Sequence, residues 1–388
     1  MDFALSEAQR LVQETARRVA RDVVAPRAAE IDEKGEYPED VFQAFKEVEL
    51  LGLAIPEEYG GSGAGILSLV LAVEEVAKYC CSSGLILLLT ALPTKPLLVG
   101  GTEEQKQKWL PAVARGDQRC AFCLTEPGAG SDAASMKTRA VRDGDSYVLN
   151  GEKIYISGGT VADFVTVFAK TDPNAGSRGV SAFIVPTDTP GFSITRTDRK
   201  MGVTGVPTAH FAMQDCRIPA ENLIGGVEGR GFAHAMATLN SVRPLVGARG
   251  LGLAQGALAY SLEYARQREA FGGPIVNLQA LQFMFAEMAM AIEASRLLVY
   301  QAGWMVDQGR VSKADAPFLS IAKATATEAA VKVSGDALQT MGAQGYMKDH
   351  PLERHYRDAK QLTIVEGTSQ VQRVIISKAL IDRDLVYN

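Results

Sequence analysis

Residues 121–132 read AFCLTEPGAGSD, and the hydrophobic periodicity of the chain changes at this stretch. Before it, apolar residues recur at helical spacing. After it, short runs of β-branched and aromatic residues alternate with Gly, Pro and Asp. A stretch rich in glycine at such a change indicates a loop that joins two domains. This loop therefore marks the boundary between a helical region and a β region.

Residues 1–119 are predicted to form a helical domain. Ser6, with Gln9 three positions later, has the pattern of a capping box. Thr102 is predicted to cap a helix over residues 103–113, because acidic residues occupy its first turn. Further helices are predicted over residues 41–51, 67–81 and 85–99, the last broken by Pro93 and Pro96.

Residues 120–230 are predicted to form a β domain. Asp143-Gly144 is typical of a two-residue hairpin turn, and Asn150-Gly151 predicts a second hairpin. Because no helical segment separates the strands, we expect an antiparallel barrel or sandwich. The strand-like runs are residues 138–141, 146–149, 153–157, 164–169, 180–185, 192–195 and 209–213.

Residues 231–388 are predicted to form a helical bundle of the four-helix type. GARGLGLAQG at 247–256 is glycine-rich, but it lies inside a helical run and lacks the spacing of a nucleotide-binding loop. It indicates close helix packing instead. The fold class is therefore mainly α with a central β domain, and not a doubly wound α/β fold. The long helical stretches are residues 232–267, 278–308, 315–342 and 368–381.

Composition excludes several classes of protein. The chain has 388 residues, a net charge of −5, 47% hydrophobic and 22% charged residues, which are ordinary globular values. Without a basic run, nucleic acid is not an expected partner. The longest apolar stretches, 66–73 and 85–89, are shorter than the ~20 residues that span a bilayer, so no membrane span is expected. The N-terminus lacks a secretory signal, which favours the cytoplasm, or an organelle matrix if a transit segment has been removed.

The cysteines do not indicate disulfides or a metal site. There are five, and two of them, Cys80 and Cys81, are adjacent. Cys120 and Cys123 have redox or zinc spacing, but no second pair accompanies them. We therefore expect buried thiols and no metal.

Two segments have the composition of a functional site. In the loop 121–132, backbone N–H groups lie beside the hydroxyls of Thr125 and Ser131, an arrangement that can hold an anionic or heteroaromatic ligand. The alternative is a turn that only connects domains. The second segment is TIVEGTSQVQR at 363–373, in which Gly367 breaks the chain after Glu366.

Glu366 follows two β-branched apolar residues, and Thr368 is predicted to cap the next helix. A carboxylate in apolar surroundings has a raised pKa and can act as a general base near neutral pH. On this segment alone, a surface glutamate that favours a helix N-terminus is the better interpretation.

Taken together, LTEPGAGSD at 124–132 and EGTSQVQR at 366–373 resemble the two signature stretches of the acyl-CoA dehydrogenase family. The similarity covers essentially the whole chain, and it implies the helical, β and helical layout predicted above. Further matches in the expected order are IPEEYGG at 55–61, TEEQKQKWLP at 102–111, ARQREAFG at 265–272 and YRDAK at 356–360.

The resemblance implies an enzyme that uses FAD to remove two hydrogens from Cα and Cβ of an acyl-CoA thioester, giving the trans-2-enoyl-CoA. Glu366 matches the base that takes the α-proton, while the β-hydrogen passes as hydride to flavin N5. Some relatives place the base immediately before the residue that matches Arg243. Val242 stands there and cannot take a proton, which favours Glu366.

The resemblance also implies binding residues, position by position. The loop that contacts the isoalloxazine and pyrophosphate corresponds to Phe122, Leu124, Thr125 and Ser131, and the strand beside the flavin corresponds to Tyr155, Ile156 and Ser157. Residues that reach the FAD of a neighbouring subunit correspond to Arg268, Phe271, Gln279, Gln339, Gly342 and Ala343, and those near the adenosine half to Thr368 and Gln370. The substrate side corresponds to Ser131, Asn240, Arg243 and Gly367.

Three residues depart from the common pattern of the family. Tyr155 replaces Trp, Val365 replaces Tyr, and Asn240 replaces Asp. Val365 enlarges and dries the pocket beside the base, so we expect an acyl group that is branched or cyclic near Cα and Cβ. The wall formed by residues 85–92 has no charged group, which disfavours a free carboxylate on the acyl tail; Lys95 is the nearest cation.

The resemblance implies a role in fatty acid metabolism, with an electron-transfer flavoprotein as acceptor. It also implies cofactor sites shared between subunits of a homotetramer, a dimer of dimers. Acyl-CoA oxidases and flavin monooxygenase relatives on the same fold are alternatives, and a non-catalytic assembly protein is a third. The length of 388 residues disfavours the oxidases, and Glu366 disfavours the other two.

Overall fold

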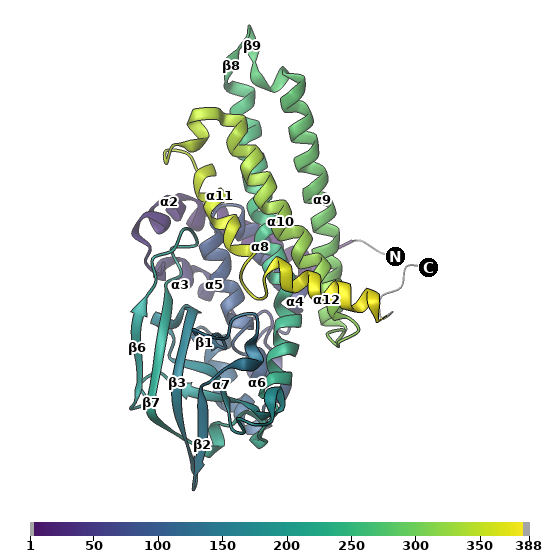
Figure 1. Cartoon of the computed structure of the whole chain (residues 1–388). Helices are drawn as coiled ribbons and strands as arrows, with labels where there is room; N and C mark the ends of the chain where they lie inside the picture. Colours follow the sequence, from purple (N-terminus) through teal and green to yellow (C-terminus); the bar gives the residue numbers. More distant parts are fainter. Residues whose placement is uncertain (1–3, 383–388) are drawn as a thin grey trace.

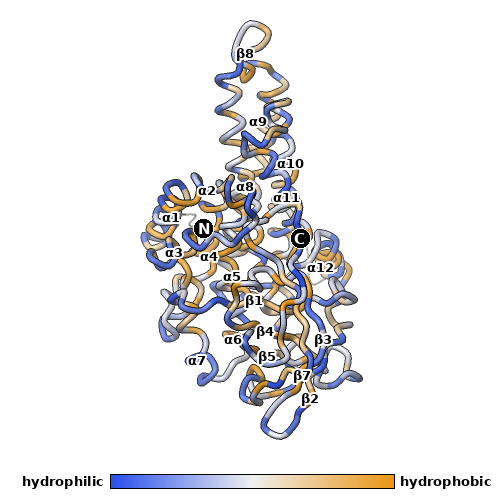
Figure 2. The backbone as a smooth tube through the Cα atoms, turned by 90° about the vertical axis from the view of Figure 1, so that its left-hand side faces the viewer, coloured by the Kyte–Doolittle hydropathy of each residue, from blue (hydrophilic) through white to orange (hydrophobic). Residues whose placement is uncertain are grey.

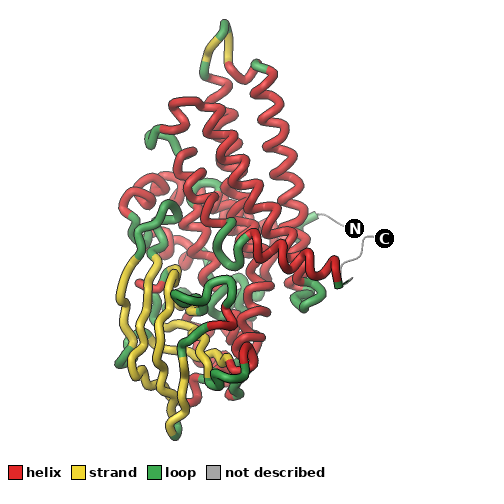
Figure 3. Tube along the Cα trace, viewed as in Figure 1, coloured by secondary structure: helices red, strands yellow, loops and turns green. Residues whose placement is uncertain are grey.

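The computed structural model describes residues 4–382 and has a helical region, a sheet and a second helical region in chain order (Figure 3). The sheet lies at one end of the molecule and the long helices extend from it toward the other end (Figure 1). This is the predicted fold class, mainly α with a central β domain. The limits 1–119, 120–230 and 231–388 of the three domains stay a prediction.

The N-terminal helices are α1 (Glu7–Val19), α2 (Ala25–Lys34), α3 (Glu39–Glu47), α4 (Gly65–Ala77), α5 (Cys81–Ala91), α6 (Lys95–Gly100) and α7 (Glu103–Ala114), with a π-helical turn, Ala20–Val24, between α1 and α2. The main strands are β1 (Cys120–Cys123), β2 (Arg139–Asp143), β3 (Ser146–Ser157), β4 (Phe164–Lys170), β5 (Val180–Pro186), β6 (Phe192–Thr197) and β7 (Thr208–Pro219). The C-terminal elements are α8 (Gly231–Gln267), β8 (Glu269–Ala270), β9 (Gly273–Pro274), α9 (Gln279–Asp307), α10 (Ala316–Met341), α11 (Leu352–Leu362) and α12 (Ser369–Ile381).

Two helices of the first region begin at capping boxes. For α1, Gln9 N donates to Ser6 Oγ at 3.2 Å and Ser6 N donates to Gln9 Oε1 at 2.9 Å. Thr102 and Gln105 form the same reciprocal pair at the start of α7. Each pair satisfies backbone N–H groups that have no partner within the helix. Both predicted helix starts are confirmed.

The seven-stranded sheet is mixed, and the prediction of a purely antiparallel sheet is wrong in this respect. The strand order is β1-β4-β2-β3-β7-β6, with β5 paired to β4. β4 runs parallel to β1 and to β2, while the other pairs are antiparallel. Parallel neighbours need a long crossover, which is commonly a helix. Here the β2–β3 hairpin lies between β1 and β4 in the chain and supplies that crossover.

The predicted second hairpin at Asn150-Gly151 is also wrong, because β3 continues through it as far as Ser157. The register against β7 shifts at this point, which marks a β-bulge. The Asn150 amide explains why the strand does not turn: it donates to Asp215 Oδ1 at 3.2 Å and its oxygen accepts from Asp215 N at 2.8 Å. The hairpin at Asp143-Gly144 is confirmed.

The largest apolar cluster joins the N-terminal helices to the bundle. It includes Leu69 and Val73 of α4, Leu87 of α5, Val246 of α8 and Leu319 of α10, all fully buried. In Figure 2 the hydrophobic stretches of α4 and α5 lie where these helices meet the others. This packing fixes the first helical region against the second.

One stretch of the described residues, Cys81–Gly100, has the length and hydropathy of a membrane-spanning helix. It comprises α5 and α6, and 72% of its most apolar 18-residue window is buried inside the protein. Burial in the core accounts for its apolar composition, since helices that are hydrophobic all round occur in cores as well as in membranes.

The glycine-rich stretch 247–256 lies within α8 and packs closely against α4 and the residues that follow it, as predicted. A Cβ on Gly252 would lie 2.2 Å from the carbonyl oxygen of Glu74, and a Cβ on Gly256 would lie 1.9 Å from that of Lys78. Neither neighbour is a flexible side chain. These glycines therefore set how closely the backbone of α8 approaches.

Gly256→Ala should lower the free energy of unfolding by roughly 1–3 kcal/mol, because the added methyl group overlaps a backbone carbonyl. Gly335→Ala, on α10, is the matched control, since its Cβ would meet nothing closer than the Tyr356 ring at 3.4 Å. That control should gain up to about 1 kcal/mol from helix propensity. Urea unfolding of both variants measures the difference, and a Gly256→Ala variant as stable as the wild type would contradict the packing argument.

Candidate active site

Glu366 lies in a tight turn between α11 and α12. Glu366 has φ 53° and Gly367 has φ 91°, both in the left-handed region. Gly367 O accepts hydrogen bonds from Lys323 Nζ and Gln372 Nε2, each at 2.9 Å. Thr368 caps α12 through its hydroxyl, as predicted, because Val371 N donates to Thr368 Oγ1 at 3.2 Å. A non-glycine residue in this conformation costs about 1–3 kcal/mol and persists only where surrounding bonds hold it.

The Glu366 carboxylate is placed in a largely water-free position. The residue is partly exposed as a whole, but its Oε2 is buried and has no hydrogen-bond partner. Burial raises the pKa of Glu366 from 4.5 to about 7, and the cations Arg249, Lys323 and Arg243 oppose that rise. The predicted apolar surroundings are therefore incomplete, since three cations act on the carboxylate.

Two of these cations are themselves held by the bundle. Arg243 Nη1 donates to Asn240 Oδ1 at 2.6 Å, and Asn240 Nδ2 donates to Val311 O at 3.0 Å. Burial lowers the pKa of Arg243 to about 10 and that of Lys323 to about 8, while Glu366 opposes both changes. The base and its cations thus form one electrostatic unit contributed by α8, α10 and the α11–α12 turn.

The loop after β1 is anchored to β3 by a buried ion pair that the sequence analysis missed. Lys153 Nζ donates to Glu126 Oε1 at 2.8 Å and to Leu124 O at 3.1 Å. Ile154 N donates to Thr125 O at 2.9 Å, and Glu126 also accepts from Thr138 N at 3.1 Å. A buried charge needs such partners. These bonds bring Leu124 and Thr125 next to the strand that carries Tyr155, Ile156 and Ser157.

The far side of this loop and strand is open. A Cβ on Gly128 or Gly130 would meet nothing within 4 Å, and Ser131 is exposed. Tyr155 has φ 60° and is 63% exposed, and its ring lies roughly perpendicular to that of His210 with the two centroids 5.6 Å apart. Open space beside two loop glycines and an exposed aromatic ring fit a flat heteroaromatic cofactor that carries phosphates.

A cavity of about 270 Å³ lies between α10, α11 and α12. Thr368 and Gln370, predicted to lie near the adenosine half of FAD, line this cavity. Ser369 Oγ and Gln372 Oε1 are buried nearby in the chain without hydrogen-bond partners. A polar cavity with unsatisfied groups suits a ligand that carries hydroxyls and a polar ring. The residues present therefore fit FAD.

The remaining predicted cofactor residues lie elsewhere. Arg268, Phe271 and Gln279 surround the β8–β9 hairpin, which is at the end of the bundle far from the sheet (Figure 1). Phe271 is 94% exposed, with φ 53°. Gln339, Gly342 and Ala343 are exposed at the end of α10. Within one chain the structure does not bring these residues to Glu366.

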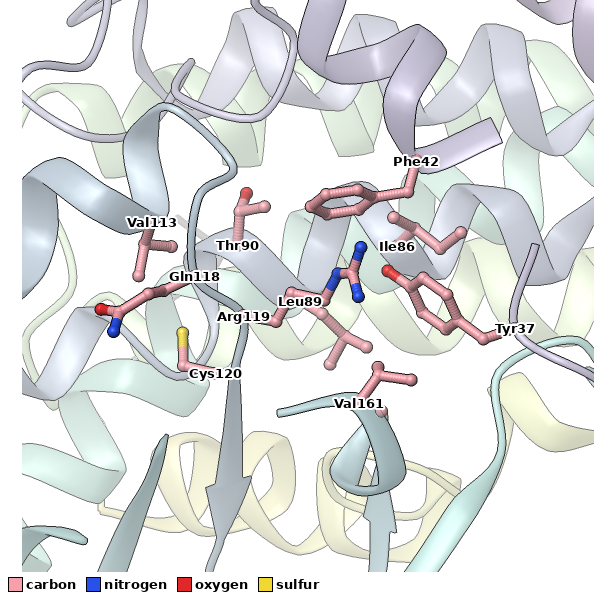
Figure 4. Close-up of a pocket in the computed structure, with 11 residues that line it drawn as sticks. Tyr37, Phe42, Ile86, Leu89, Thr90, Val113, Gln118, Arg119, Cys120 and Val161 are labelled. Carbon is pink, nitrogen blue, oxygen red and sulfur yellow. The ribbon is translucent and has the colours of Figure 1, made fainter. Parts of the chain in front are cut away.

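A second, smaller cavity does not include Glu366, but Ile86, Leu89 and Thr90 of α5 line it (Figure 4). It has about 20 Å³, room for about one water molecule. Arg119 lies in it over the rings of Phe42, at 4.0 Å, and Tyr37, at 5.2 Å. None of the predicted site residues lines it. The described cysteines are all buried and free, and no group of three or more potential metal ligands occurs among residues 4–382.

Sequence reasoning missed Glu126, Lys153, Lys323 and Arg249. Lys323 and Arg249 stand in alanine- and glycine-rich helices, where a lone cation among small residues is an available signal. Glu126 and Lys153 are far apart in sequence and on different elements, so only the fold pairs them.

Comparison with known proteins agrees with this geometry. The family models for the N-terminal, middle and C-terminal domains of acyl-CoA dehydrogenase match residues 6–117, 121–216 and 229–381. The chain is 43% identical over 385 residues to acryloyl-CoA reductase (NADH) of Anaerotignum propionicum, covering 99% of this chain and 97% of that protein. It is 42% identical over 378 residues to cyclohex-1-ene-1-carbonyl-CoA dehydrogenase of Geobacter metallireducens, covering 97% and 99%.

A solved structure of the electron transferring flavoprotein of Acidaminococcus fermentans, concerned with flavin-based electron bifurcation, contains a similar chain. That chain superposes with a TM-score of 0.95 at 43% identity, covering 98% of this chain and 100% of the other. The three family models, the near-complete coverage and a site that fits FAD lead to one conclusion. This chain belongs to the acyl-CoA dehydrogenase family, whose members are FAD-dependent oxidoreductases acting on acyl-CoA.

Proposed function

We propose that this protein removes hydrogen from Cα and Cβ of an acyl-CoA thioester to give the 2-enoyl-CoA, with Glu366 as the base. The observation that carries the proposal is the buried Glu366 Oε2, which has no hydrogen-bond partner in the protein. A general base needs a free lone pair that faces the proton it takes. Val242, the other position that relatives use, is an apolar side chain.

The neighbours of Glu366 hold the pKa of its carboxyl group near neutrality. Burial favours the protonated acid, while Arg249, Lys323 and Arg243 favour the carboxylate, and the balance leaves the pKa at about 7. A base with a pKa close to the working pH combines a sizeable ionised fraction with a strong affinity for the proton. The strained turn fixes the direction of the carboxylate, since Lys323 and Gln372 hold Gly367 O.

When bound, FAD supplies the acceptor for the β-hydrogen as hydride. The chain's own part is to position the cofactor. We assign the ring to the loop with Phe122, Leu124, Thr125 and Ser131 and to residues 155–157, and the adenosine half to the cavity with Thr368 and Gln370. Arg268, Phe271, Gln279, Gln339, Gly342 and Ala343 are assigned to the cofactor of a neighbouring subunit.

The acyl group is proposed to be compact, branched or cyclic near Cα and Cβ. Val365 directly precedes the base and packs against the core that contains Leu85 and Leu88 of α5. A valine side chain leaves more room beside the base than the tyrosine that many relatives carry. The relative of Geobacter metallireducens, named for a cyclic acyl-CoA, supports this choice.

We assign Ser131, Asn240, Arg243 and Gly367 to binding of the CoA thioester.

We infer that an electron-transfer flavoprotein accepts the electrons. The similar chain in the structure of an electron transferring flavoprotein supports this partner. The exposed ring of Tyr155 on β3 gives such a partner access to the flavin side of the sheet.

The assembly is proposed to be a homotetramer. Along α9, exposed apolar side chains recur every seven residues, which places them on one face of the helix. They are Phe283, Met290, Leu297 and Trp304, exposed by 61, 71, 59 and 46%. A stripe of this length on a soluble chain is an interaction surface, and a second copy supplies an apolar partner of matching shape.

Anaerobic titration of the FAD-loaded protein with linear, branched and cyclic acyl-CoAs, followed by flavin absorbance, tests the reaction. We expect bleaching by a branched or cyclic member. Preference for butyryl- or octanoyl-CoA would contradict the acyl-group proposal. No bleaching by any member, nor by the dicarboxylic acyl-CoAs used in the next subsection, would contradict the reaction.

Glu366→Gln should keep its FAD while its reduction rate falls about 10²- to 10⁴-fold. Glu47→Gln, at an exposed site on α3, is the matched control.

The rate of flavin reduction should depend on pH through Glu366. Only the carboxylate takes a proton, so the rate should fall about tenfold for each pH unit below the pKa of about 7 and level off above it. Stopped-flow reduction between pH 5 and 9 measures the profile, with FAD content checked at each pH. A flat profile across this range would exclude Glu366 as the titrating base.

The double variant Met290→Glu/Leu297→Glu should dissociate the assembly, because two charges on the α9 face cannot be buried without partners. Light scattering after size-exclusion chromatography measures the mass. Leu11→Glu, at a 65% exposed leucine on α1, is the control and should keep the wild-type mass. A double variant with unchanged mass would rule out this face as the interface.

A further inference from the structure

Arg249 is a fully buried arginine in the middle of α8 whose hydrogen-bonding capacity is mostly unused. Its exposure is 0%, and it is the largest of the fully buried side chains. Nη2 donates to Cys81 O at 3.3 Å, to Cys81 Sγ at 3.4 Å and to Gln361 Oε1 at 3.1 Å. Nε and Nη1, which carry three of the five N–H donors of the guanidinium, have no hydrogen-bond partner.

This guanidinium lies at the acyl side of the proposed site. Cys81 begins α5, whose residues 85–92 form the wall expected beside the acyl group. Gln361 is in the last turn of α11, and its carbonyl accepts from Val365 N at 3.1 Å, directly before the base. Among the cations that act on Glu366, Arg249 has the largest effect. Arg249 is therefore enclosed by the same elements that enclose the acyl chain.

The charges around the base are unbalanced. Arg243, Lys323 and Arg249 all act on Glu366, and Glu328 also acts on Lys323. Once Glu366 has taken a proton, none of the three retains that counter-charge. Buried polar groups in proteins are nearly always paired, and a buried unpaired charge is strongly unfavourable. A planar guanidinium with free N–H groups is suited to a carboxylate, which can accept two of them side by side.

We propose that Arg249 binds a carboxylate at the distal end of the acyl group, so that the substrate is a CoA monothioester of a short dicarboxylic acid. This inference rests on the proposed dehydrogenation and names its substrate class. It replaces the expectation that a tail carboxylate is disfavoured, which considered the wall at 85–92 and not the cation that α8 brings there. The distal carboxylate supplies the missing counter-charge and the acceptors for Nε and Nη1.

Matched substrate pairs test the proposal, because an isopropyl group has the shape of a carboxylate without its charge. The pairs are succinyl-CoA with 4-methylpentanoyl-CoA, and glutaryl-CoA with 5-methylhexanoyl-CoA. For the wild-type protein we expect kcat/KM of flavin reduction to favour the carboxylate member of at least one pair by about 10²-fold or more. Preference for the isopropyl member of both pairs would overturn the proposal, whatever any variant does.

Arg249→Met should lower kcat/KM for the dicarboxylic substrate by about 10²- to 10³-fold and change that for its isopropyl partner less than tenfold. Arg249→Lys should recover part of the preference. Arg142→Met, at an exposed site on β2, is the control and should leave both members of each pair unchanged. Equal losses on both members of a pair in Arg249→Met would show a structural role only and refute the proposal.

A binding measurement separates this inference from the proposed reaction. Calorimetric titration of FAD-loaded Glu366→Gln with succinyl- and glutaryl-CoA, each against its isopropyl partner, reports recognition without turnover. Tighter binding of succinyl- or glutaryl-CoA than of its isopropyl partner supports Arg249 as the group that binds the carboxylate. Weaker binding of both dicarboxylic members than of their isopropyl partners overturns the proposal. If monocarboxylic branched or cyclic acyl-CoAs bleach the flavin while dicarboxylic ones neither bind nor react, this inference fails and the proposed reaction stands.

Discussion

The opposition between burial and three cations at Glu366 is the constraint on which the rest of this site depends. Burial alone would keep the carboxyl group protonated, and the cations alone would leave a weakly basic carboxylate. Their balance places the pKa near neutrality. The same carboxylate is also what makes the cations tolerable in the core, since it supplies their counter-charge. Base and cations are therefore interdependent.

Helix α8 connects this electrostatic unit to the architecture. Val242 and Arg243 lie nearly two turns before Arg249. The glycine-rich segment that contains Arg249 packs against the backbone of α4 and of Lys78, which follows it. Close approach at Gly252 and Gly256 leaves no room for the helix to shift. The placement of the cations thus follows from backbone packing, and the small residues that make the packing possible also allow a large arginine to lie among them.

Much of the fold was predictable because its signals are local. Residues close together in the sequence specify the capping boxes at Ser6 and Thr102, the hairpin at Asp143-Gly144 and the long helices. The two errors concern the sheet. The parallel partners of β4 and the continuation of β3 through Asn150 depend on residues far away in the chain, such as Asp215. No local pattern records which strand lies beside which.

The sequence by itself determined the order of the three regions, the position of Glu366 before a glycine turn and, through its motifs, the family. These depend on residues that are adjacent or evenly spaced along the chain. Only the tertiary structure decided that Lys153 pairs with Glu126, that three cations converge on Glu366, and that Nε and Nη1 of Arg249 have no hydrogen-bond partner. Electrostatic effects and hydrogen bonds depend on distance and burial in space, and residues as far apart as Cys81, Arg249 and Gln361 meet only after the helices have packed.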